Sequence, residues 1–205
     1  MTLNTRNYSN KIVDRIMLDA GAIYLNTKLE NGEFTGTELG ATQGGNEFSI
    51  ETEIRNIGVD GVKGRAKGLN VLESANPKLK VNLLEITARN LAMAIAGSNL
   101  DTTSDEAYDI LTGSDSIKLE EYLDNIAFVG RLGTTGRNKP VIIVIENVLQ
   151  LDPVSIKTTD KGEVVLALNF TGHYSEQQIL NGTQPYKIYY PKEKEVTSPP
   201  ETESP

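Results

Sequence analysis

Residues 58–70, GVDGVKGRAKGLN, combine glycine with basic side chains, a composition that can bind anions. Lys63, Arg65 and Lys67 alternate with four glycines: Gly58, Gly61, Gly64 and Gly68. Glycine-rich turns expose backbone N–H groups that can form an anion nest. However, the segment lacks both the Gly-Lys-Ser/Thr ending of a nucleotide-binding loop and the dinucleotide fingerprint, and no amphipathic helix follows it. Three interpretations remain: a weak anion nest, a mobile surface loop, and a loop ordered by an acidic protein surface.

Three carboxylates lie on one predicted strand, NEFSIETEI, residues 46–54. Glu47, Glu51 and Glu53 share one face of this strand, and residues i and i+2 on such a face are about 6–7 Å apart. Paired carboxylates can hydrolyse glycosides. A carbohydrate cleft also needs stacking aromatic side chains, but the chain has no tryptophan and its eight tyrosines lie elsewhere in the sequence. A solvated strand face is therefore the better interpretation of the three carboxylates.

His173 is the only histidine, and cysteine is absent. These two facts exclude histidine-rich metal sites, zinc–thiolate sites, iron–sulfur clusters, disulfides and thiol catalysis. A Ser-His-Asp triad would have to use His173, which stands in FTGHYSE at the end of an alternating strand. We interpret it as a structural or surface histidine, and we predict no enzyme, no cofactor and no metal.

Composition narrows the class of protein further. The 205 residues are 38% hydrophobic, which is enough for one packed core. Twenty basic against 28 acidic residues give a formal charge of −8, which argues against a general nucleic-acid-binding surface. The first residues carry no signal-peptide core, and no run of about 18 apolar residues spans a membrane. We expect a soluble protein that is made and used without export.

Hydrophobic patterning predicts a mainly β protein. Besides 46–54, apolar runs or alternation indicate strands at 22–29, 78–86, 125–132, 140–151, 163–174 and, as an edge strand, 185–190. TARNLAMAIAG predicts one helix over 88–96, with Thr87 as its N-cap and Gly97 as its stop. SDEAYDIL, residues 104–111, indicates a second short helix capped by Ser104.

The domain organisation follows from composition. A mostly polar N-terminal segment covers 1–18, and a single domain covers 19–190. Residues 98–120 are predicted to be an insertion within this domain. Residues 191–205 are rich in proline and glutamate, which predicts a disordered tail.

A resemblance to a known family is carried by several segments in order. These are LDAGAIYLN, LGATQGGNEFSIETEIRNIGVDGVKGRAKGLN, KLKVNLLEIT, YLDNIAFVGRL, PVIIVIENVL and LNFTGHY. Together they resemble the major tail protein of long non-contractile-tailed bacteriophages, the tail tube protein. The resemblance covers about residues 18–175 and leaves the insertion and the proline-rich terminus unmatched.

The resemblance implies a fold and an assembly. The fold is a sandwich or barrel of two antiparallel sheets with one flanking helix, and six copies form a ring. Rings stack into a hollow virion tube through which DNA passes without specific binding. The implied partners are the chain itself, the tape measure protein and other tail components, with no membrane involved.

Two hypotheses connect this resemblance to particular residues. An acidic wall repels phosphate and lets DNA slide, so we expect Glu47, Glu51 and Glu53 to line the bore. The glycine-rich loop, with Lys63, Gly64, Arg65, Lys67 and Gly68, is expected to contact a neighbouring subunit or ring. The alternatives are a related tail part that forms a single ring, such as a terminator or distal tail protein, and a carbohydrate-binding β-sandwich.

Overall fold

The computed structural model describes residues 12–134, 140–158 and 160–192. The described chain is mainly β, and its strands pair antiparallel. Its elements, in order, are α1 (Ile12–Arg15), β1 (Met17–Glu30), β2 (Glu33–Glu38), β3 (Thr42–Asn56), β4 (Asn70–Leu83), α2 (Ala88–Ala94), β5 (Ser98–Asp101), β6 (Ile110–Gly113), the 3₁₀ helix η1 (Leu119–Glu121), β7 (Leu123–Leu132), β8 (Val141–Gln150), β9 (Leu166–Gly172), α3 (Glu176–Asn181) and β10 (Tyr186–Tyr189).

Eight strands form one sheet that branches at β8. The order is β2-β1-β7-β8-β9-β4-β3, and β10 also pairs with β8. Residues Ile142–Ile145 of β8 pair with β10, whereas Val148–Gln150 pair with β9. The sheet therefore divides into two layers that share β8, instead of the two separate sheets that the resemblance implies. The physical reason is that β8 is long enough for its backbone groups at Ile142–Ile145 to pair with β10 and those at Val148–Gln150 to pair with β9.

The core lies between these two layers. β1, β7 and β8 contribute buried side chains from one side, and β4 and β9 contribute them from the other; they form one cluster with Ile23, Leu25, Ile126, Ile145, Leu79, Val81, Leu83, Leu166, Leu168 and Phe170. Asn46 on β3 also donates a side-chain hydrogen bond to the carbonyl of Ala20 on β1. The sheet thus curls so that its β3 end approaches β1, which leaves a partly closed barrel around an apolar interior.

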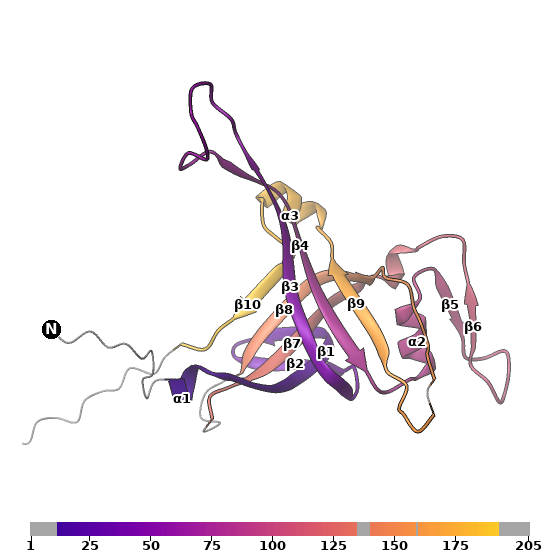
Figure 1. Ribbon diagram of the computed structural model, residues 1–205. Helices are drawn as coiled ribbons and strands as arrows, with labels where there is room; N and C mark the ends of the chain where they lie inside the picture. Colours follow the sequence, from indigo (N-terminus) through magenta and orange to yellow (C-terminus); the bar gives the residue numbers. More distant parts are fainter. Residues whose placement is uncertain (1–11, 135–139, 159, 193–205) are drawn as a thin grey trace, which may run out of the picture.

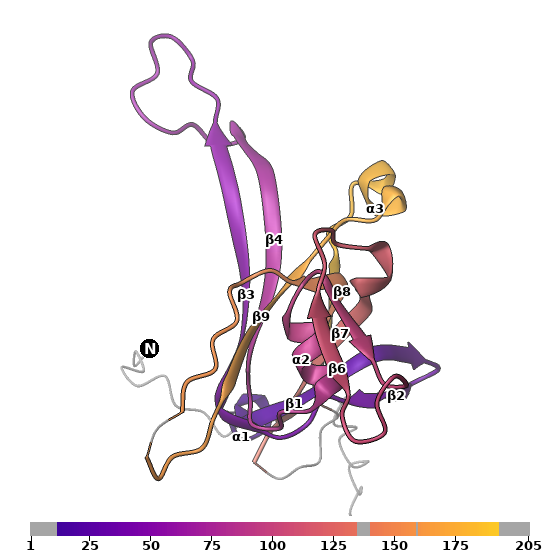
Figure 2. The same cartoon turned by 90° about the vertical axis from the view of Figure 1, so that its right-hand side faces the viewer.

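The helix predicted at 88–96 is present as α2. The Thr87 hydroxyl accepts a hydrogen bond from the Asn90 N–H, as the N-cap signal predicts. The helix ends at Ala94 with Ile95 as its C-cap, and Gly97, the predicted stop, has φ +74° two residues further on. Leu91, Met93 and Ala94 pack on the core. Gln150, at the end of β8, donates to the carbonyl of Ala94. α2 therefore flanks the sheet and covers one side of the core (Figure 2).

The prediction of a second helix at 104–111 is wrong. Residues 98–113 form a separate two-stranded ribbon of β5 and β6, beside α2 in Figure 1. The Ser104 hydroxyl donates to the Asp101 carboxylate instead of capping a helix. Short polar side chains compete with helix formation in this way because they hydrogen-bond to their neighbours in turns. Two short helices that the sequence reading did not predict, α1 and α3, lie near the two ends of the described chain.

Most predicted strands are confirmed, and several are longer than predicted. β1 has 14 residues where eight were predicted, and β4 begins at Asn70, eight residues before the predicted start. Two parts of the predicted organisation lie outside the described residues: the N-terminal segment 1–18 before Ile12, and the tail 191–205 after Lys192.

Candidate interaction surfaces

A long β-ribbon made of β3 and β4 extends beyond the body of the molecule (Figures 1 and 2). The two strands pair from Thr42↔Leu83 to Asn56↔Asn70. Near the body, Phe48 packs on the core. A register shift at Glu53/Ile54 lies within the exposed part of β3, and the ribbon then continues into the loop. We call residues 54–72 the arm.

The arm carries apolar side chains that the described residues leave in solvent. Ile54 is 56% exposed and Leu72 is 50% exposed, although they pair across the ribbon. Four further apolar side chains of the arm are at least 38% exposed: Ile57, Val59, Val62 and Val71. Although Ile54 continues the apolar alternation of β3, its side chain is not buried, because the body ends before that residue. Contiguous exposed apolar surface in a soluble protein marks an interaction site.

The loop at the tip of the arm holds the three predicted basic residues. Lys63, Arg65 and Lys67 are exposed and form no hydrogen bond or ion pair with any described residue. The Ile57 N–H donates to the carbonyl of Leu69 at 2.8 Å, which closes the base of the loop. Gly61, Gly64 and Gly68 have positive φ, and a Cβ on any of them would meet no atom within 4 Å. These glycines are thus required by backbone conformation and not by crowding.

The three predicted carboxylates are all exposed. Glu47, Glu51 and Glu53 occupy alternate positions of β3, while Phe48 between them faces the core. The neighbouring strand adds basic side chains to this face, which the sequence of β3 alone does not show. Lys80 of β4 pairs in register with Glu47, and the Lys78 Nζ lies 2.8 Å from Glu51 Oε2. The face is therefore acidic in excess but mixed in sign, because strand pairing interleaves residues that are about 30 positions apart in the sequence.

A shallow hollow of about 230 Å³ lies at the base of the same face. Its lining contains only polar residues and glycine: Gly44, Gly45, Asn46, Glu47, Lys80 and Asn82. The Asn46 amide donates to Ala20 and Thr42, and its Oδ1 is buried without a hydrogen-bond partner among the described residues. With no apolar wall, the hollow offers an organic ligand little surface to pack against.

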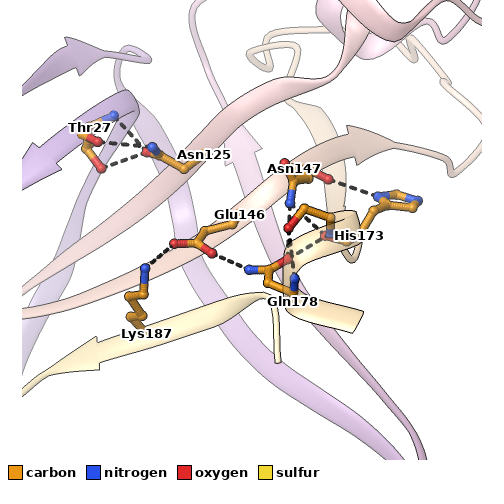
Figure 3. Close-up of polar contacts among 8 residues, drawn as sticks. Thr27, Asn125, Glu146, Asn147, His173, Gln178 and Lys187 are labelled. Atoms are coloured by element: carbon orange, nitrogen blue, oxygen red, sulfur yellow. Dashed lines mark hydrogen bonds and ion pairs between the residues drawn. The ribbon is translucent and has the colours of Figure 1, made fainter. Parts of the chain in front are cut away.

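His173 belongs to a network that fastens α3 to the sheet (Figure 3). Its Nδ1 lies 3.1 Å from the carbonyl oxygen of Asn147 on β8, and its ring makes an edge contact with Tyr122. The Asn147 side chain donates to the His173 carbonyl and to Gln178 of α3. These partners are a backbone carbonyl, an amide and an aromatic ring, which supports a structural role for this histidine.

Glu146 joins two elements of this network. It accepts hydrogen bonds from Gln178 of α3 and from the Lys187 Nζ of β10, the latter at 2.6 Å (Figure 3). The Glu146 hydrogen bond raises the pKa of Lys187, against a smaller opposing effect of desolvation. β10 is thereby held on β8 by an ion pair as well as by its backbone ladder.

The insertion 98–120 presents a second exposed surface, which we call the acidic hairpin. It carries six acidic residues and one lysine: Asp101, Asp105, Glu106, Asp109, Asp115, Glu120 and Lys118. Hydrogen bonds from Ser104 and Thr103 lower the pKa of Asp101 well below its usual range, so this carboxyl stays ionised. Tyr108 beside them is 74% exposed, and Leu119 is 86% exposed.

Within residues 12–134, 140–158 and 160–192, no group of three potential ligands is placed to hold a metal ion. In the same ranges, every helix is too short or too polar to cross a membrane.

Comparison with known proteins yields no match, either to a protein family or to a curated protein.

Proposed function

We propose that this chain is a structural subunit of a long-tailed bacteriophage, which assembles as stacked hexameric rings into the tail tube of the virion. The observation that supports this most is the arm, a ribbon with exposed apolar side chains and an unpaired basic tip. Such a surface is costly for a monomer in water, and a contact with another copy removes that cost.

Ring formation would use the open edges of the sheet. Among the described strands, β2 and β3 end the strand order, and β10 pairs on one side only, with β8. Open edges are templates for pairing with another chain, and their closure around a ring builds one continuous barrel. A head-to-tail contact that closes gives a ring, whereas a second head-to-tail contact that stays open grows a filament.

The bore would be lined by the outer face of β3. Glu47, Glu51 and Glu53 are exposed there, with Lys78 and Lys80 beside them. Three carboxylates against two ammonium groups leave the face net negative. A net negative wall offers DNA no cluster of cations whose binding would release counterions, so the duplex passes without being held.

The arm would link one ring to the next. Lys63, Arg65 and Lys67 would meet acidic groups of a neighbouring copy, while Gly64 and Gly68 allow the loop its conformation. Tape measure protein and other tail components would contact the completed rings, in keeping with the resemblance.

Electron microscopy of the purified full chain at rising concentration tests this function. We expect rings with a central hole that elongate into hollow tubes as concentration increases. Rings that never elongate would instead support the single-ring alternative, a terminator or distal tail protein. A chain that stays monomeric at millimolar concentration would contradict the proposal.

A further inference from the structure

Two projecting elements of the described chain carry unpaired charges of mostly opposite sign. The arm tip carries Lys63, Arg65 and Lys67, with Asp60 as the one acidic residue in 57–69. The acidic hairpin carries most of the chain's net negative charge in 23 residues. None of the three cations has an ionic partner among the described residues.

Some carboxylates of the acidic hairpin are engaged within it, and others are available. Asp101 accepts hydrogen bonds from Thr103 and Ser104, and Asp105 accepts them from the N–H groups of Ala107 and Tyr108. Those bonds fix the shape of the loop. In contrast, Glu106, Asp109 and Asp115 are exposed and form no hydrogen bond or ion pair with a described residue.

The two elements are also matched in apolar surface. The tip of the arm exposes Val59 and Val62, and the hairpin exposes Tyr108 and Ile110 between its free carboxylates. An interface with apolar contacts at its centre and opposite charges around them is the usual arrangement of a specific protein contact. Charge alone would give only a weak, screened attraction.

The two elements of a single chain point away from each other. The arm extends from one end of the body, whereas β5 and β6 lie beside α2 at the level of the body, in both views (Figures 1 and 2). The basic side chains at the arm tip of one copy can therefore meet the carboxylates of the acidic hairpin only on another copy.

We propose that the acidic hairpin, residues 98–120, is the surface that receives the arm of a neighbouring copy. This inference rests on the proposed function, and it names the acceptor surface for the contact between subunits. Lys63, Arg65 and Lys67 pair with Glu106, Asp109 and Asp115, and Val59 and Val62 pack against Tyr108 and Ile110. The contact is head-to-tail, because donor and acceptor surfaces differ, so it can propagate from subunit to subunit.

Disulfide trapping tests the contact directly, because the natural chain has no cysteine. R65C chains are mixed with equal amounts of D109C chains and oxidised mildly. We expect a disulfide-linked heterodimer as the main product, at least tenfold above the yield from R65C mixed with K157C, a control on an exposed loop. Equal yields from the two mixtures would overturn the proposal.

Charge reversal gives a second readout. The arm set K63E/R65E/K67E and the hairpin set E106K/D109K/D115K should each raise the concentration needed for assembly at least tenfold. The two sets combined in one chain should restore assembly. The control set K28E/K157E/K192E changes net charge by the same amount as the arm set, and it should assemble as the natural chain does.

These experiments separate the two proposals. If the natural chain forms tubes and the hairpin set assembles equally well, the acceptor lies elsewhere and only the present inference fails. If the natural chain never assembles, the proposed function itself fails. Circular dichroism of each variant shows that the fold is retained, since all the substituted residues are exposed.

Discussion

Gly172 lies on β9 where a side chain has no room. A Cβ at this position would lie 2.5 Å from Ile145 Cγ2 and 3.0 Å from Pro77 Cγ, both within the body. Overpacking of this kind typically costs 1–3 kcal/mol, which exceeds the gain of about 0.4–1 kcal/mol from a less flexible unfolded chain. We therefore expect Gly172→Ala to lower the free energy of unfolding by about 1–2 kcal/mol, measured by urea denaturation of the monomer.

Gly113→Ala is the matched control for this prediction. Gly113 also lies on a strand, β6, but a Cβ there would meet no atom within 4 Å. Its substitution should leave stability unchanged or slightly raised. If both variants are equally stable, the packing described around β9 is incorrect.

At the residue scale, the alternation of the sequence predicted which side chains are exposed. It did not predict which side chains of the neighbouring strand lie beside them. Alternation in 46–54 predicted the exposure of Glu47, Glu51 and Glu53, because one residue in two faces away from the core. It could not predict that Lys78 and Lys80 would lie among them, since the register between β3 and β4 is a tertiary property. The net charge of a strand face can therefore be predicted only when the neighbouring strand and its register are known.

At the scale of a single element, the acidic hairpin should contribute to folding stability in a pH-dependent way. Asp101 has a folded-state pKa lowered by hydrogen bonds from Ser104 and Thr103. A lowered pKa means that its stabilisation is present above the unfolded pKa of about 3.9 and is lost as pH falls through the folded value. We expect the stability difference between the natural chain and Asp101→Ala to be constant above about pH 5 and to shrink below pH 4.

Urea midpoints measured from pH 2 to pH 7 check this expectation. Asp109→Ala is the control, because Asp109 forms no hydrogen bond with a described residue. Its stability difference should not follow the same curve. A difference for Asp101→Ala that grows as the solution becomes more acidic would contradict the hydrogen bonding described for the hairpin.

Elements were predictable where local signals agree. The helix predicted at 88–96 has an N-cap and an apolar face, and the structure confirms a helix there, although it ends at Ala94, two residues earlier than predicted. The segment 104–111 has a cap-like serine and acidic residues but little apolar periodicity, so local turns and pairing with β5 determine its structure. β4 was predicted too short because its outer end, residues 70–73, is exposed and carries no burial pattern. Hydrophobic alternation marks a strand only where one of its faces is buried, and the strands of the arm have no buried face.

At the scale of the whole molecule, assembly should depend on salt through the arm tip. Replacement of Lys63, Arg65 and Lys67 by serine removes three exposed cations without loss of an internal contact among the described residues. We expect the triple variant to keep the fold and to form few or short tubes. Its remaining assembly should vary little between 50 mM and 500 mM salt, because the screened interaction is absent.

Electron microscopy across that salt series measures tube length directly. The natural chain should form shorter tubes as salt rises. Tubes of normal length from the triple variant at every salt concentration would show that the basic loop is irrelevant to assembly.

The most direct test of the central claim is a cryo-electron microscopy map of the assembled full chain. We predict a hollow tube of stacked six-membered rings in which Glu47, Glu51 and Glu53 face the bore and each arm contacts a neighbouring copy. A map with a cationic inner wall and these glutamates on the outer surface, or preparations that hold only monomers at every concentration, would contradict it.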